Sequence, residues 1–134
     1  LLGLNRDTGI KEVVAAGLMS VCYQTRDLLE AMINDGADLA DTLRVDGGMV
    51  ANDWFAQALA DTLDAKVQRP QIIETTALGA AYLAGLHCGI FKSLVEIEAL
   101  WQCKVEYIGS IDNDRRESLY GGWLEAIERV KTKK

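Results

Sequence analysis

The most informative stretch of the sequence is residues 45–52, which read Val-Asp-Gly-Gly-Met-Val-Ala-Asn. A short predicted strand over 43–46 ends in the glycine pair, and the residues that follow have the pattern of a helix. Glycine has no Cβ, so Gly47 and Gly48 allow a positive φ and let a ligand approach the backbone closely. The amides that begin the next helix favour an anion there. The stretch therefore predicts a ligand-binding turn; an ordinary strand-to-helix turn is the alternative.

Helices and strands alternate around this turn. In chain order, the pattern predicts a helix over 10–33, a strand over 43–46, a helix over 51–63, a strand over 66–69 and a helix over 77–86. Asp7 or Thr8 is expected to cap the first helix, and Thr75 or Thr76 the third. Pro70 ends the second strand because proline cannot donate a ladder hydrogen bond. This alternation predicts an α/β fold with a parallel pair of strands.

The pattern changes after Gly89. Ser93 and Glu96 form a capping box for a short helix to about Trp101, and residues 103–108 are predicted as an edge strand. A last amphipathic helix presents an apolar face made by Leu119, Tyr120, Trp123, Leu124, Ile127 and Val130.

The predicted parallel strands are too few for an ordinary sheet, which has about four to six strands. We therefore expect further strands upstream of Leu1, which is not a methionine. The outer edge of residues 43–45 would then be unpaired, so we expect the isolated chain to self-associate or to swap segments.

Composition excludes several classes of protein. The 134 residues are 49% hydrophobic and include only one proline, which is typical of one folded domain rather than a disordered chain. The net charge of −6 argues against nucleic-acid binding. The longest uncharged stretch, 75–91, is shorter than a membrane span, and no signal peptide is visible, so we expect a cytoplasmic protein. Three cysteines without a C-x-x-C pair predict buried free thiols rather than disulfides or a zinc site.

Isolated polar residues are weaker candidates for chemistry. His87 is the only histidine and is expected to cap a helix end or to be packed, rather than to act as a general base. Asp35, Asp38 and Asp41 predict a solvated face rather than a metal site. Arg44 and Arg69 fall on the two parallel strands and are expected to pair with carboxylates, with a phosphate contact as the alternative. Neither a P-loop nor a dinucleotide-binding glycine motif is present.

Three blocks carry a resemblance to a known family. Residues 23–32, 43–48 and 76–86, in this order and spacing, resemble the FGGY carbohydrate kinases, and among them the glycerol kinases. The resemblance covers roughly residues 3–86, and the helix with Trp123 resembles the family's C-terminal helix. It implies the ribonuclease H-like fold shared by actin, hexokinase and the Hsp70 ATPase. On this view residues 1–134 are the C-terminal part of the nucleotide-binding lobe, with helices packed on a short parallel sheet and the upstream strands and N-terminal lobe outside the chain.

The resemblance also implies site residues. Asp46, Gly47 and Gly48 match the family's adenosine motif, in which the glycine backbone lies against the ribose and phosphate end of the nucleotide. Gly48 and Asn52 would contact ATP or ADP directly, while Gly47 and Asp46 would shape the loop. Some relatives have a second asparagine where this chain has Asp53, which affects a peripheral contact only.

The helix over 77–86 matches the family's second connecting motif, a small-residue helix beside the hinge between the lobes. Gly79 and the alanines around it would allow another backbone to come close. A tightly packed core helix is the compatible alternative.

The function implied by the resemblance is transfer of the ATP γ-phosphate to a terminal hydroxyl of glycerol, giving glycerol 3-phosphate. The Mg²⁺ ligands, the catalytic base and the glycerol contacts would lie outside this chain, so we expect no catalytic or metal-ligating residue within it and no turnover by the chain alone. The intact enzyme is expected to be a homo-oligomer. A relative that phosphorylates another sugar or polyol, and a non-catalytic helical interaction module, are the alternatives.

Overall fold

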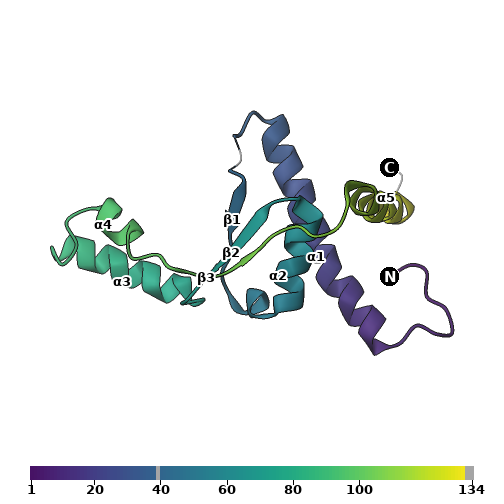
Figure 1. Ribbon diagram of the computed structural model, residues 1–134, viewed down its shortest axis with the longest axis horizontal. Coiled ribbons are helices and arrows are strands. Elements are labelled where there is room, and N and C mark those ends of the chain that lie inside the picture. Colours follow the sequence, from purple (N-terminus) through teal and green to yellow (C-terminus); the bar gives the residue numbers. More distant parts are fainter. Residues whose placement is uncertain (39, 132–134) are drawn as a thin grey trace.

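The computed structural model describes residues 1–38 and 40–131, and the predicted order of helices and strands is confirmed (Figure 1). The elements are α1 (Ile10–Asn34), β1 (Thr42–Arg44), the 3-10 turn η1 (Gly48–Ala51), α2 (Asp53–Leu63), β2 (Lys66–Pro70), α3 (Thr75–His87), α4 (Leu94–Glu98), β3 (Cys103–Tyr107) and α5 (Asn113–Val130).

The three strands form one sheet in the order β1-β2-β3. β1 runs parallel to β2, with Leu43 opposite Val67, as the alternation predicted. β3 is an edge strand, also as predicted, but it runs antiparallel to β2, with Tyr107 opposite Val67. The sheet is therefore mixed rather than parallel throughout. Within the described residues the outer edge of β1 has no partner strand.

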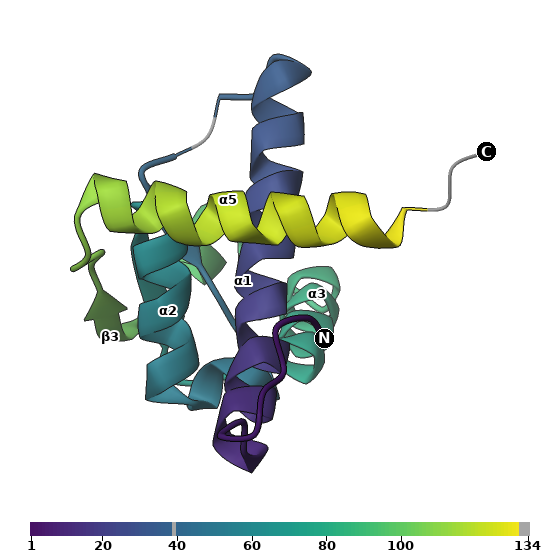
Figure 2. The same ribbon diagram turned by 90° about the vertical axis from the view of Figure 1, so that its right-hand side faces the viewer.

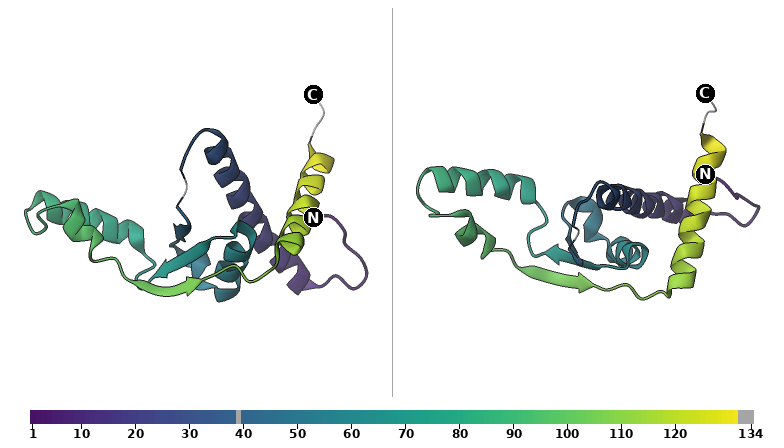
Figure 3. Two further views of the ribbon diagram at one scale, coloured as in Figure 1. Left: turned by 45° about the horizontal axis from the view of Figure 1, so that its top comes forward. Right: turned by 90° about the horizontal axis from the view of Figure 1, so that it is seen from above.

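The core lies between one face of this sheet and the helices α1 and α2, which both cover that face (Figure 3). Its buried side chains are Cys22, Val50, Phe55, Ala56, Leu59, Ala60, Val67 and Tyr107. Side chains alternate between the two faces of a strand, so Gln68 and Glu106 lie on the opposite face. There the Gln68 amide donates to the Glu106 carboxylate at 2.6 Å. Alternate residues of β2 thus face either the buried core or a polar face of the sheet.

The long helix α1 is present, but the prediction that it is substantially buried is wrong for both of its ends, since Leu28 and Ile33 near its C-terminus are 61% and 54% exposed. Ile10 is 83% exposed and Val14 54%, whereas Cys22 is fully buried. α2 and the sheet reach only the middle of α1, and no element of the described ranges covers its start. The two predicted caps are wrong as well. The N-cap is Gly9, and its amide donates to the Glu12 carboxylate at 2.8 Å. The Thr8 hydroxyl instead donates to the Asn5 side-chain oxygen at 3.1 Å.

Helix α5 lies across α1 and α2 (Figure 2). The Asp27 carboxylate of α1 accepts two hydrogen bonds from α5, one from the Tyr120 hydroxyl at 2.5 Å and one from the Trp123 indole at 2.9 Å. At the start of α5, the buried Arg116 pairs with Asp64, which follows α2, at 2.7 Å. These polar contacts fix the last helix although Leu124 and Val130 on its apolar face are exposed.

Helices α3 and α4 extend away from the sheet (Figure 1). The alanines at 77, 80, 81 and 84 are exposed, so a tightly packed core helix is the wrong interpretation for the part of the chain that the structure describes. α3 begins at Thr75 with Glu74 at the N-cap, so neither predicted threonine caps it. Ser93 caps α4 as predicted, although α4 ends at Glu98, before Trp101.

All three cysteines are free thiols, but only Cys22 is buried, and the expectation of burial is wrong for Cys88 and Cys103. Burial raises the pKa of the Cys22 thiol to about 11 because it disfavours the thiolate. Across residues 1–38 and 40–131, none of the helices has the length and apolar character that a membrane span requires.

Candidate functional site

The loop after β1 has the backbone conformation that the glycine pair predicts. Gly47 has φ +88° and ψ 174°, a positive-φ conformation that only glycine adopts at low cost. Its amide donates to the carbonyl of Ile73 at 3.0 Å. The Asp46 carboxylate accepts a hydrogen bond from the hydroxyl of Thr75, the first residue of α3. The loop is therefore tied on one side to the start of α3.

Gly48 leaves an open surface. It begins η1, it is exposed, and a Cβ added to it would meet no atom within 4 Å. Because the space outside its backbone is empty of protein atoms, a ligand can lie directly against it. The absence of a side chain is therefore not demanded by packing within the chain.

Asn52 separates η1 from α2, which corrects the prediction of one helix from Ala51 onward. Its side-chain oxygen accepts hydrogen bonds from the amides of Trp54 (3.0 Å) and Phe55 (3.3 Å), so it is the N-cap of α2. Its side-chain amide donates no hydrogen bond to any described residue, which leaves a donor for a ligand. Gly48 and Asn52 thus stand at the two ends of a single turn.

Two charged residues, Arg69 and Asp53, hold the turn between Gly48 and Asn52 in place. Arg69 Nη1 lies 2.7 Å from the carbonyl oxygen of Val50, 3.2 Å from that of Ala51 and 2.8 Å from Asp53 Oδ1. The same carboxylate accepts a hydrogen bond from the Tyr107 hydroxyl at 2.6 Å. The tyrosine bond and then the guanidinium hold the pKa of Asp53 below its usual value. The predicted pairing of Arg69 with a carboxylate is therefore confirmed.

Sequence reasoning missed how Asp53 and Tyr107 meet, because they are far apart in the chain. One signal was available: Arg69 follows Val67 by two residues, so a strand places both on the same, core-facing side. A charged residue on a core-facing side needs a partner close by.

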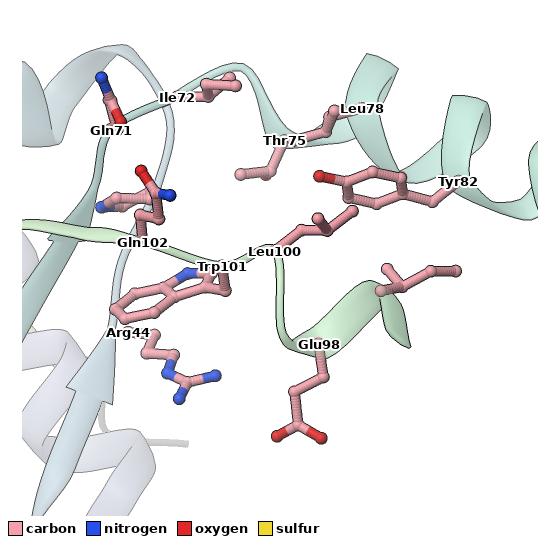
Figure 4. A pocket seen from close by; sticks show the side chains of 13 residues that line it. Arg44, Gln71, Ile72, Thr75, Leu78, Tyr82, Glu98, Leu100, Trp101 and Gln102 are labelled. Carbon is pink, nitrogen blue, oxygen red and sulfur yellow. The ribbon is translucent and has the colours of Figure 1, made fainter. Parts of the chain in front are cut away.

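A cavity of about 340 Å³ lies next to the loop, between the sheet, α3 and α4 (Figure 4). Thr75 and Gly79 of α3 line it, and Thr75 also bonds the Asp46 carboxylate. Across the cavity, the Arg44 guanidinium lies 4.2 Å from the centre of the Trp101 ring and forms a cation–π contact. The expected pairing of Arg44 with a carboxylate is therefore wrong. A second cavity, lined by Thr42 and Lys66, lies at the opposite ends of β1 and β2.

The remaining candidates stay apart from this site. His87 ends α3 and is exposed, so it is not packed. Asp35, Asp38 and Asp41 are exposed, as expected of a solvated face. Among the residues that the structure describes, no group of three or more acidic, histidine or cysteine side chains could hold a metal ion.

Comparison with known proteins matches residues 1–88 to the FGGY family of carbohydrate kinases, C-terminal domain. A glycerol kinase of Ectopseudomonas mendocina is 55% identical over 98% of the chain, and glycerol kinase 1 of Pseudomonas aeruginosa is 52% identical over 98%. The chain covers 27% of the first protein and 26% of the second, so it spans about a quarter of these relatives' length.

Solved structures show the same fold. A crystal structure of Plasmodium falciparum glycerol kinase with ADP superposes with a TM-score of 0.82 at 29% identity, covering 98% of this chain and 26% of that one. A ligand-bound xylulose kinase from Lactobacillus acidophilus gives 0.79 at 18% identity, covering 96% of this chain and 26% of that one. The expected fold is therefore confirmed.

Proposed function

The chain belongs to the FGGY family of carbohydrate kinases, and we propose that it is the C-terminal part of the nucleotide-binding lobe of an ATP:glycerol 3-phosphotransferase. In this proposal Gly48 and Asn52 contact ATP or ADP, and Gly47 and Asp46 shape the loop. The observation that carries it is the open turn after β1, where Gly48 leaves room against the backbone and the Asn52 side-chain amide is available as a donor. The similar Plasmodium falciparum enzyme was solved with ADP, which supports a nucleotide as the ligand.

Helix α3 would connect this turn to the motion of the lobes. Thr75 bonds the Asp46 carboxylate, and the alanines of α3 are exposed on a helix that extends from the sheet. Because alanine side chains are small, this helix surface suits close packing at a hinge between lobes that close over ATP and the acceptor.

Glycerol is the acceptor we favour over another sugar or polyol. The relatives of 50–55% identity are named glycerol kinases, whereas the xylulose and gluconate kinases that share the fold are 18% identical. The family match favours a kinase over a non-catalytic helical module. As the resemblance implies, the proposal places the Mg²⁺ ligands, the catalytic base and the glycerol contacts elsewhere in the intact enzyme. A cytoplasmic homo-oligomer remains the expectation for that enzyme.

A hybrid enzyme tests the proposal. This chain would replace the matching segment of the Ectopseudomonas mendocina glycerol kinase, and ATP-dependent phosphorylation of glycerol would be measured with the parent enzyme as reference. In parallel, MgADP would be titrated into the ¹⁵N-labelled chain while the amide signals of Gly47, Gly48 and Asn52 are followed.

We expect a hybrid with a KM for ATP close to that of the parent, and no turnover by the chain alone. Saturable shifts confined to the three amides would indicate that the nucleotide turn is preformed in the chain. A folded hybrid that binds no MgADP would refute the proposal, and glycerol phosphorylation by the pure chain would refute the assignment of the catalytic residues to the rest of the enzyme.

A further inference from the structure

An arginine is buried beneath the turn that joins the two expected nucleotide contacts. Arg69 is 8% exposed, and its Nη1 atom donates to the carbonyls of Val50 and Ala51 at 2.7 and 3.2 Å. These carbonyls lie between Gly48 and Asn52. A buried guanidinium is tolerated only when its donors are paired, and here its partners are the backbone of that turn. The position of the turn therefore depends on the arginine.

The carboxylate that completes this arrangement lies on the other side of Asn52. Asp53 Oδ1 is 2.8 Å from Arg69 Nη1 and accepts the Tyr107 hydroxyl at 2.6 Å. The guanidinium carbon also lies 5.6 Å from the centre of the Tyr107 ring. Arg69 thus holds the residue before Asn52 and the residue after it, and Tyr107 connects the arrangement to β3.

The register of the sheet explains why this arginine, and not its neighbour, reaches the turn. Val67 pairs with Tyr107 and Arg69 with Val105, so Arg69 and Tyr107 share the face that carries α2. Arg44 pairs with Gln68 and lies on the opposite face, where it stacks on Trp101. Arg44 makes no hydrogen bond or ion pair with the turn, so the sheet offers a matched arginine for comparison.

We propose that Arg69 is a positioning residue for the nucleotide turn, which with Asp53 and Tyr107 holds Gly48 and Asn52 at the spacing that the nucleotide requires. The identity of the ligand rests on the proposed function above. Arg69 does not need to touch the nucleotide to have this effect. Its positive charge also offsets the negative charge of the Asp53 carboxylate, which would otherwise repel an anionic ligand at the start of α2.

The test compares Arg69→Met with Arg44→Met, because each removes one positive charge from a neighbouring strand. The amide signals of Gly47, Gly48 and Asn52 are recorded in the full chain without nucleotide. KM for ATP and kcat are then measured in the hybrid enzyme. Arg69→Lys serves as the conservative variant, since one ammonium group cannot reproduce the planar fork of a guanidinium.

We expect Arg69→Met to move the Gly48 and Asn52 signals and to raise KM for ATP by about tenfold or more, the effect of losing a charge-assisted hydrogen bond. The change in kcat should be smaller, Arg69→Lys should be intermediate, and Arg44→Met should leave both readouts near wild type. If Arg69→Met does not fold, Tyr107→Phe keeps the ring and the arginine, and it should shift the same signals by less.

Unmoved signals and an unchanged KM in folded Arg69→Met would overturn the proposal, as would an equal effect of Arg44→Met. Failure of the proposed function is a separate result. In that case the wild-type hybrid binds no nucleotide, while the signals of the turn in the chain still respond to Arg69→Met.

Discussion

Replacing each glycine of the pair with alanine should separate folding from nucleotide binding. Gly47 has φ +88° and ψ 174°, a region that is essentially restricted to glycine, and alanine there costs about 1 to 3 kcal/mol. Gly48 has no positive φ, and an added Cβ would meet nothing within 4 Å. Alanine there restricts the unfolded chain without strain and should stabilise the fold by about 0.4 to 1 kcal/mol. The two variants should therefore differ by about 1.5 to 4 kcal/mol in the free energy of unfolding.

Nucleotide binding should respond differently. In the proposed complex the nucleotide fills the space next to Gly48, so a methyl group there should cost about 1 to 3 kcal/mol. That is a rise of about 5- to 150-fold in the dissociation constant for MgADP. The Gly48→Ala variant should thus be as stable as wild type, or more so, and bind worse.

Urea unfolding of the chain and MgADP binding to the hybrid enzyme measure the two effects. Gly122→Ala is the control, because Gly122 lies in the middle of α5 with nothing within 4 Å of an added Cβ. It should stabilise the helix by about 0.5 to 1 kcal/mol and leave binding unchanged. Wild-type MgADP affinity in Gly48→Ala, or a marked loss of its stability, would refute the reasoning.

Four further predictions concern the fold. At pH 8 a thiol reagent should label Cys88 and Cys103 quickly but not Cys22, whose pKa burial raises to about 11; rapid labelling of all three would contradict this. The pKa of Cys22 in the folded state, about 11, lies above its unfolded value of 9.0, so the stabilisation from the buried thiol is complete below pH 9. About 2 to 3 kcal/mol of the free energy of unfolding should be lost as the pH rises to 11. Urea unfolding at several pH values measures this loss, and a constant stability over that range would contradict it. The Tyr120→Phe substitution removes the 2.5 Å hydrogen bond to Asp27 and should lower the free energy of unfolding by about 1 to 3 kcal/mol. Urea unfolding measures this change, and an unchanged midpoint would contradict the prediction. The unpaired edge of β1 should make the chain self-associate, and a single monomeric species in sedimentation would argue against it.

The elements and the candidate loop were predictable because their signals are local. Local patterns identified the α-helices and strands of the described residues, though not η1, and the glycine pair identified the positive φ at Gly47, since both depend only on neighbouring residues. Helix ends were less predictable. The predicted helix from Ala51 in fact begins after Asn52, which is its N-cap. The Thr75 hydroxyl donates to the Asp46 carboxylate and does not cap α3. Caps compete with tertiary partners that local patterns do not contain.

The α/β alternation, the glycine turn and the family could be read from residue type and order along the chain. The residues that hold the site come together only through tertiary packing. Asp53 and Tyr107 are 54 positions apart, and Asp27 and Tyr120 are 93 apart, yet each pair shares a short hydrogen bond. The turn between Gly48 and Asn52 is held by the Arg69 guanidinium from β2, a carboxylate from α2 and a hydroxyl from β3. Such contacts form only when strand register and helix packing bring distant segments together.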